Sequence, residues 1–200
     1  MKLAVILLSC VAFSSARANI VNINFDEFTS PPVTCCYATT GVLGPLVYPT
    51  VTVVDGSGGG YVMNGSGWNN EQTSGNNLFG TGSGTIYLNF VSPVSNVNLD
   101  VINGESASNF TVNAYDPLNN TIFGQTQALN SFGGAGSVSH FDANVADIKQ
   151  LAVYGNFDFA IDTVSFNTNT STTPEPALYG ILAFGMVLLG LARSFRKAKA

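Results

Sequence analysis

The chain between Asn19 and Thr172 has almost no basic side chains. It holds 11 of the 12 acidic residues of the sequence, whereas Lys149 is its only lysine or arginine. The resulting net charge of about −10 makes nucleic acid and anionic lipid headgroups unsuitable partners, because like charges repel. Acidic surfaces of this kind occur in proteins that bind divalent cations and in secreted proteins that repulsion keeps soluble.

Histidine is also scarce, which restricts catalysis. His140 is the only histidine, so a Ser-His-Asp arrangement would have to use it. Ser139 and Asp142 are close in sequence, but Ser139 and His140 would point to opposite faces of a strand. We therefore expect His140 at a sheet surface. No nucleotide-binding loop or metal-hydrolase motif is present, and a carboxylate pair for glycoside hydrolysis stays open.

Only three cysteines occur, and two of them are neighbours. If Cys10 is removed with a signal peptide, Cys35 and Cys36 remain in an oxidising compartment. They could form a vicinal disulfide that fixes a rare turn, pair with other chains, or stay as free thiols. A zinc site is not supported, because a tetrahedral site needs four ligands.

The sequence between residues 19 and 168 predicts an all-β domain. Helical periodicity is hard to find, whereas short alternating apolar runs bounded by Gly, Asn, Ser and Pro recur. Regular spacing of such runs predicts an antiparallel jelly-roll β-sandwich, with a hairpin turn at 116–120. The expected strands are Thr85 to Phe90, Val94 to Ile102, Asn109 to Tyr115, Thr121 to Gln127, Ser137 to Phe141, Ile148 to Tyr154 and Phe157 to Phe166.

The last expected strand changes its apolar parity. Phe159 and Ile161 would lie on one face, but Val164 and Phe166 would lie on the other. A bulge near Asp162 would restore the register.

The opening Ile23-Asn24-Phe25-Asp26-Glu27-Phe28 and the closing Phe159 to Phe166 resemble the galactose-binding-like and carbohydrate-binding-module sandwiches. The resemblance implies that the first and last strands lie side by side and that carboxylates there hold a structural calcium. Asp26, Glu27 and Asp162 are the candidate ligands, because a hard cation needs six to eight oxygens. Carboxylates that only solvate strand ends are the alternative.

The segment from Asp55 to Gly84 contains ten glycines and is expected to form loops. It also contains Trp68, the only tryptophan, beside amide side chains at positions 69, 70 and 72. A flat ring amid amides suits sugar recognition, and Tyr61 could add a second platform. A tryptophan packed over a sheet edge is the alternative.

The N-terminus predicts a signal peptide over residues 1–18. Lys2 precedes an apolar run from Leu3 to Phe13, and Ala16 and Ala18 are the small residues that a signal peptidase requires. A lipobox ending at Cys10 is the alternative, but it would leave a very short apolar segment.

The C-terminus combines three elements in order. A linker, residues 169–176, ends in Pro174-Glu175-Pro176, and an apolar stretch follows within residues 177–200. The chain closes with a basic cluster that would stay in the cytoplasm by the positive-inside rule, at Arg193, Arg196, Lys197 and Lys199.

This tail resembles the sorting tail of bacterial PEP-CTERM proteins. The resemblance implies export in a Gram-negative bacterium, a transient transmembrane helix in the inner membrane, and recognition by an exosortase-type membrane protease. Release to the cell surface or extracellular matrix, often alongside exopolysaccharide, would follow. An ordinary single-pass anchor is the alternative, although sixteen apolar residues span only about 24 Å of a hydrocarbon core of about 30 Å.

Taken together, these features favour a non-enzymatic surface or matrix protein associated with extracellular polysaccharide, with calcium as the only candidate cofactor. A surface-anchored polysaccharide hydrolase or lyase is the enzymatic alternative. A structural protein that assembles through Cys35 and Cys36 and binds nothing specific is the third.

Overall fold

Nearly all regular structure is β-strand in the computed structural model, which describes residues 18–28, 44–69 and 71–168. The strands are β1 (Asn19–Ile23), β2 (Leu46–Val47), β3 (Val51–Asp55), β4 (Tyr61–Asn64), β5 (Asn77–Thr81), β6 (Thr85–Asn103), β7 (Ser108–Tyr115), β8 (Thr121–Leu129), β9 (Val138–Ala143), β10 (Ile148–Tyr154) and β11 (Phe159–Thr168). A 3-10 turn, η1 (Gly65–Trp68), follows β4. Neighbouring strands pair antiparallel, which confirms the all-β antiparallel prediction.

Several predictions concern parts of the chain outside the described residues. These are the signal peptide up to residue 17, Cys35 and Cys36, the linker with Pro174-Glu175-Pro176, and the 177–200 helix with its basic cluster. Within residues 18–28, 44–69 and 71–168, no helix is long and apolar enough to cross a membrane.

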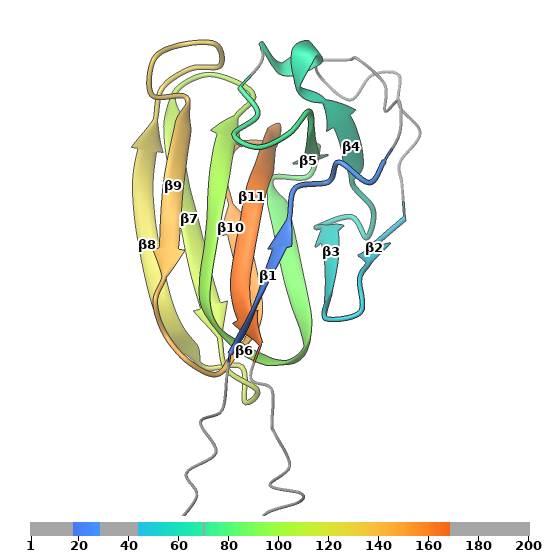
Figure 1. The fold of residues 1–200 in the computed structure, drawn as a ribbon. Helices are drawn as coiled ribbons and strands as arrows, with labels where there is room; N and C mark the ends of the chain where they lie inside the picture. The colour runs from blue at the N-terminus through green and yellow to red at the C-terminus, as the bar shows by residue number, and fades with distance from the viewer. Residues whose placement is uncertain (1–17, 29–43, 70, 169–200) are drawn as a thin grey trace, which may run out of the picture. The chain divides into compact units, whose positions relative to one another are not determined.

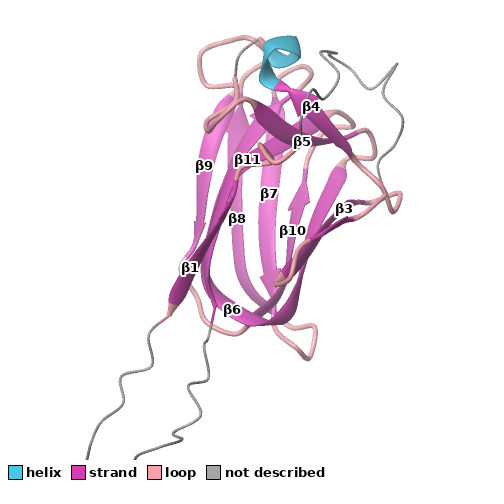
Figure 2. Ribbon diagram, turned by 45° about the vertical axis from the view of Figure 1, so that its right-hand side comes forward, coloured by secondary structure: helices cyan, strands magenta, loops and turns pink. Residues whose placement is uncertain are grey.

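The strands form two packed layers joined by β6 (Figure 1). In the first layer, residues 85–94 of β6 pair with β3 and β10, and β7 and β8 continue beyond β10. In the second layer, residues 94–103 of β6 pair with β9 and β11, and β11 also pairs with β1 and β5. Figure 2 shows β6 curving from one layer to the other.

The sequence predicted two strands where the structure has this one. Ile86, Leu88 and Phe90 point inward in the first half, and Val97 and Leu99 do so in the second. Asn96 lies between them with φ of 52°, and this left-handed residue changes the parity without ending the strand.

One hydrophobic cluster fills the space between the layers. Phe90 on β6 meets Phe166 on β11 with ring centroids 5.0 Å apart, and Phe110 on β7 meets Phe159 on β11 at 5.5 Å. The buried members of this cluster lie between Ile23 and Phe166 and belong to the unit formed by residues 18–169. This unit therefore contains its own core and can be produced by itself.

The bulge predicted in the last strand is confirmed. The register between β11 and β6 shifts after Asp162, and Thr163 takes a φ of 49°. Ile161 and Val164 are both buried as a result. The pairing of β1 with β11 likewise confirms that the first and last strands lie side by side.

The glycine-rich segment is not the loop that its composition predicted, because it contains β4, η1 and β5. Glycine serves close packing here. At Gly60, which has a φ of 131°, a Cβ would lie 2.1 Å from the Phe79 ring. At Gly75 it would lie 1.5 Å from the Asp26 carboxylate. The absent side chains make room for these contacts.

Candidate functional site

The outer surface of the first layer gathers three tyrosines from adjacent strands: Tyr87 on β6, Tyr154 on β10 and Tyr115 on β7. Strand pairing places the residues around them on the same surface, which we call the tyrosine face. It consists of Thr52, Val54, Thr85, Tyr87, Asn89, Thr111, Asn113, Tyr115, Gly124, Thr126, Gln150, Ala152 and Tyr154.

Strand alternation explains why these residues face outward. On each strand the intervening positions carry core residues, such as Leu88 on β6, Val112 on β7 and Val153 on β10. Since successive side chains point to opposite faces, the burial of one set leaves the other set on the surface. The three tyrosines are half-buried there.

The tyrosines surround the small side chain of Ala152. This residue is opposite Tyr87 on β6 and Asn113 on β7, and it has no exposed surface although it lies on the outer side of the sheet. The ring of Tyr154 meets that of Tyr87 edge to face with centroids 6.5 Å apart, and its hydroxyl lies 3.3 Å from that of Tyr115. The rings are therefore held by one another and by the sheet.

Amides and hydroxyls complete the tyrosine face. Gln150 Nε2 donates to Asn89 Oδ1 at 2.7 Å, and Asn113 Nδ2 donates to the Tyr115 hydroxyl at 3.4 Å. Each amide still has donor or acceptor capacity beyond these bonds. The face can therefore offer both donors and acceptors to a ligand rich in hydroxyl groups.

The tyrosine face carries no charged side chain, although the domain around it is strongly acidic. Burial, followed by the hydrogen bond to Tyr115, raises the pKa of the Tyr154 phenol above its usual value. This phenol therefore stays neutral throughout the physiological pH range. A surface of this kind suits an uncharged ligand.

A pocket of about 270 Å³ lies between β1 and the turn that joins β2 to β3, and its lining is mainly apolar. It is lined by residues 21–24, Glu27 and residues 48–50. The Tyr48 hydroxyl donates to Glu27 Oε1, and burial together with this contact raises the pKa of Tyr48. The pocket is slightly smaller than typical small-molecule sites of about 300–1,000 Å³.

Asp26 and Asp162, two of the predicted calcium ligands, hold the same segment of residues 73–77. Buried Asp162 accepts backbone N–H bonds from positions 73, 74 and 163 at 2.7–2.8 Å and the Ser74 hydroxyl at 2.8 Å. Asp26 Oδ1 accepts the backbone N–H groups of positions 76 and 77 at 2.8 and 3.1 Å. Burial raises the pKa of the Asp162 carboxyl, and its hydrogen bonds oppose that shift.

The two carboxylates do not fit a cation site as they stand, because N–H and O–H donors occupy the oxygens that a metal would need. The third candidate, Glu27, instead accepts the Tyr48 hydroxyl. In the described ranges, no group of three or more His, Cys, Asp or Glu side chains could hold a metal ion. Structural calcium stays a prediction, and the geometry gives Asp26 and Asp162 the role of loop anchors.

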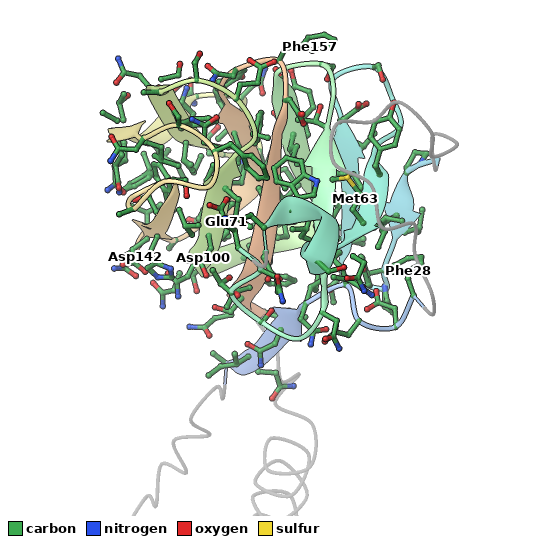
Figure 3. The ribbon with its side chains drawn as sticks, turned by 90° about the horizontal axis from the view of Figure 1, so that it is seen from above. Phe28, Met63, Glu71, Asp100, Asp142 and Phe157 are labelled. Atoms are coloured by element: carbon green, nitrogen blue, oxygen red, sulfur yellow. The ribbon has the colours of Figure 1, made fainter. Side chains whose placement is uncertain are left out.

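Trp68 does not have the exposed ring that sugar stacking requires, since its side chain is 1% exposed. It covers a second, smaller cluster on the outer side of the second layer, with Met63, Leu78, Ile102 and Ala160. Its Nε1 donates to Met63 Sδ at 3.1 Å (Figure 3 labels Met63 beside η1). The alternative, a tryptophan packed over a sheet, describes this residue correctly. Tyr61, the second candidate platform, packs partly buried against the same cluster.

His140 lies on the outer surface of the second layer, as predicted, with a side chain that is 52% exposed. Its Nδ1 is 2.6 Å from Asp100 and its Nε2 is 3.1 Å from Asp142, and Figure 3 shows these two carboxylates close together. The hydrogen bond to Asp100 raises the pKa of His140. Ser139 instead donates to Gln127, so it does not meet the imidazole.

The sequence contained the signal for the tyrosine face, although only the structure shows that the three tyrosines meet. The predicted strands place Tyr87 and Tyr115 at positions that alternate with buried residues. Aromatic residues at outward positions of predicted strands are the signal that points to these two tyrosines. Their assembly depends on the order β6-β10-β7, which short alternating runs do not encode.

No protein-family model matches the chain, and no curated protein matches its sequence. Similar solved structures include a DUF4465 family protein from Bacteroides caccae, with a TM-score of 0.48 and 10% identity over 74% of this chain and 98% of that chain. A peptidoglycan O-acetylesterase has a TM-score of 0.36 and 15% identity over 64% of this chain and 35% of that one.

A third similar structure is that of TmCBM61 in complex with β-1,4-galactotriose. It has a TM-score of 0.33 and 10% identity over 61% of this chain and 86% of that chain. Similarity at these levels does not identify a function. The function has to be inferred from the residues themselves.

Proposed function

We propose that this protein binds an uncharged polysaccharide on the tyrosine face and that it is not an enzyme. The observation that carries the proposal is the composition of this face, in which three tyrosines lie among amides and hydroxyls without any charge. The alternative is a polysaccharide hydrolase or lyase. A hydrolase would need a carboxylate pair beside the bound chain, and the tyrosine face contains no carboxylate.

The chemistry of the face fits sugar in two ways. A phenol ring offers an apolar surface to the C–H groups of a pyranose and a hydroxyl at its edge. Amides such as those of Asn89 and Gln150 can donate to and accept from sugar hydroxyls. The five strands β3, β6, β10, β7 and β8 extend the surface over about 19 Å at 4.7–4.9 Å per strand, enough for several sugar units.

Charge determines which polysaccharides are suitable. An acidic polymer would be repelled by a domain whose net charge is about −10, and the tyrosine face has no cation to pair with it. A neutral chain avoids this repulsion and leaves no charge desolvated. The proposed ligand class is therefore a neutral glycan.

The sorting tail supports a surface location for this activity. We propose export through the signal peptide, recognition near Pro174-Glu175-Pro176 by an exosortase-type protease, and delivery to the cell surface or matrix. The proposed fold family is the jelly-roll, galactose-binding-like sandwich, which fits such a role. The intact mass of the mature protein tests the sorting step: loss of the residues beyond about position 176 is expected, and a mass retaining residues 177–200 would contradict it.

Affinity electrophoresis tests the ligand class. The unit of residues 18–169 should be slowed in gels containing neutral galactans or glucans and should run freely in gels containing alginate or hyaluronan. The retardation should not change between about 0.05 and 0.5 M salt, because screening affects only charged partners. Retardation by the acidic polymers alone, with a steep loss at high salt, would contradict the proposal.

A further inference from the structure

Among the described residues, strand β8 is an edge of the first layer with no strand paired to its outer side. It pairs with β7 on one side, and the order of strands in the described sheet ends with it (Figure 1). It is nine residues long, and its ladder with β7 is regular from Phe123 to Leu129; the register shift near its start leaves one extra residue, Ile122, on β8. The backbone groups on its outer side therefore form a template for another strand.

Natural proteins usually protect such edges with charges, prolines, bulges or short strands. The sequence of β8, Thr-Ile-Phe-Gly-Gln-Thr-Gln-Ala-Leu, contains neither a charged residue nor a proline. Its outward positions Gly124, Thr126 and Ala128 are exposed and uncharged. An unprotected edge of this length indicates a pairing surface.

The other edge strands of the described sheet are protected. β1, β2 and β4 have five, two and four residues. β9 carries His140 and Asp142, and the Gln127 side chain donates to the His140 carbonyl at 3.0 Å. The contrast between these edges and β8 shows that the missing protection is local.

We propose that β8 pairs with β8 of a second copy of this chain, antiparallel across a two-fold axis. Such pairing is self-complementary, because each copy offers the same unpaired donors and acceptors. With full overlap, Gln125 lies at the axis and no charged residue of either strand meets another. This matters because each domain has a net charge of about −10, and two copies can approach most closely where neither is charged.

Pairing would join the first layers of both copies into one continuous sheet. Gly124 and Thr126 belong to the tyrosine face, so the two tyrosine faces would then share one surface. This consequence rests on the proposed function, whereas the strand pairing itself does not. Two linked faces on one polymer would bind more tightly than one, because the second contact becomes intramolecular.

Sedimentation velocity of the 18–169 unit over a range of concentrations tests the pairing. The wild-type unit should shift from monomer to dimer as its concentration rises. Ala128→Lys should remain monomeric, because it places a lysine on the pairing edge, opposite Ile122 of the second copy, and an edge lysine opposes pairing with another strand. The added lysine also lowers the net negative charge of each copy, which weakens the general repulsion between copies and by itself favours the dimer. A change in net charge therefore cannot explain a loss of dimerisation.

Ala146→Lys is the matched control, since it makes the same change at an exposed site between β9 and β10. It should dimerise like the wild type. Thr126→Lys provides a second edge variant with the same expected loss. A wild type that stays monomeric at about 1 mM, or edge variants that dimerise like Ala146→Lys, would overturn the inference.

Hydrogen exchange gives an independent readout. Amides in residues 121–129 should become more protected as the wild-type concentration rises, and those of Ala128→Lys should not. Short oligosaccharides should bind to Ala128→Lys with unchanged affinity, whereas its retention on long polymers should fall about tenfold or more. Dimerisation without sugar binding would contradict the proposed function and support the strand pairing. Sugar binding without dimerisation would support the proposed function and contradict the strand pairing.

Discussion

Replacing Trp68 with alanine separates the two roles that the sequence left open for this side chain. If Trp68 is a sugar platform, the variant should lose polysaccharide binding and keep its stability. If Trp68 is a buried anchor, the variant should lose stability and still bind. The structure predicts the second outcome, because the ring is 1% exposed and covers Met63, Leu78 and Ile102.

The expected loss follows from the packing around the ring. Truncation of a buried tryptophan to alanine usually costs about 3–5 kcal/mol, which includes the cavity left behind. Trp68 also contacts Phe132 edge to face at 5.6 Å, and its indole N–H would no longer reach Met63. For a domain of this size, the melting temperature should fall by roughly 6–20 °C.

Urea denaturation followed by circular dichroism measures this loss without depending on the indole. Leu118→Ala is the control, because its side chain is 82% exposed and its loss should cost within about 0.5 kcal/mol. Trp68 is also the only tryptophan, so its fluorescence should not change when polysaccharide is added. A Trp68→Ala protein as stable as the wild type, or one that is folded but no longer binds polysaccharide, would refute this reasoning.

Two further predictions concern polar groups. Asp162→Ala should lower the free energy of unfolding by about 2–4 kcal/mol, because it leaves backbone N–H groups at 73 and 74 unpaired; a change below about 1 kcal/mol in urea denaturation would contradict the loop-anchor role. The raised pKa of His140, due first to Asp100, implies a stabilising contribution that is full below pH about 6.5 and is lost as the pH rises through the folded-state pKa. Denaturation at several pH values should show this loss in the wild type but not in His140→Gln, and identical pH profiles would contradict it.

Sequence patterns predicted the strands better than their assembly. Alternation identified the hairpin of β7 and β8 and the bulge after Asp162, because both depend on local chemistry and parity. Alternation divided β6 into two strands, because a change in which positions are apolar resembles the end of a strand. The left-handed conformation of Asn96, which lets the strand continue, is visible only in the structure.

Composition was less reliable for the site. Trp68 is surrounded in sequence by amides, but η1 turns its ring into a cluster with residues from β4, β5, β6 and β11. The glycines nearby allow this close packing and were mistaken for loop signals. Tyr87 and Tyr154 lie 67 positions apart, and only the pairing of β6 with β10 brings them together.

The affinity of the tyrosine face for a neutral polysaccharide tests the central claim most directly. Isothermal titration should compare the wild-type unit with Tyr87→Ala, Tyr154→Ala and the control Ile20→Ala, which removes an exposed side chain of the second layer. Circular dichroism should first confirm that each protein is folded. Each tyrosine variant should lose about tenfold in affinity, equivalent to about 1.4 kcal/mol, and the control should bind like the wild type. Equal affinity in all four proteins would show that the tyrosine face is not the binding site.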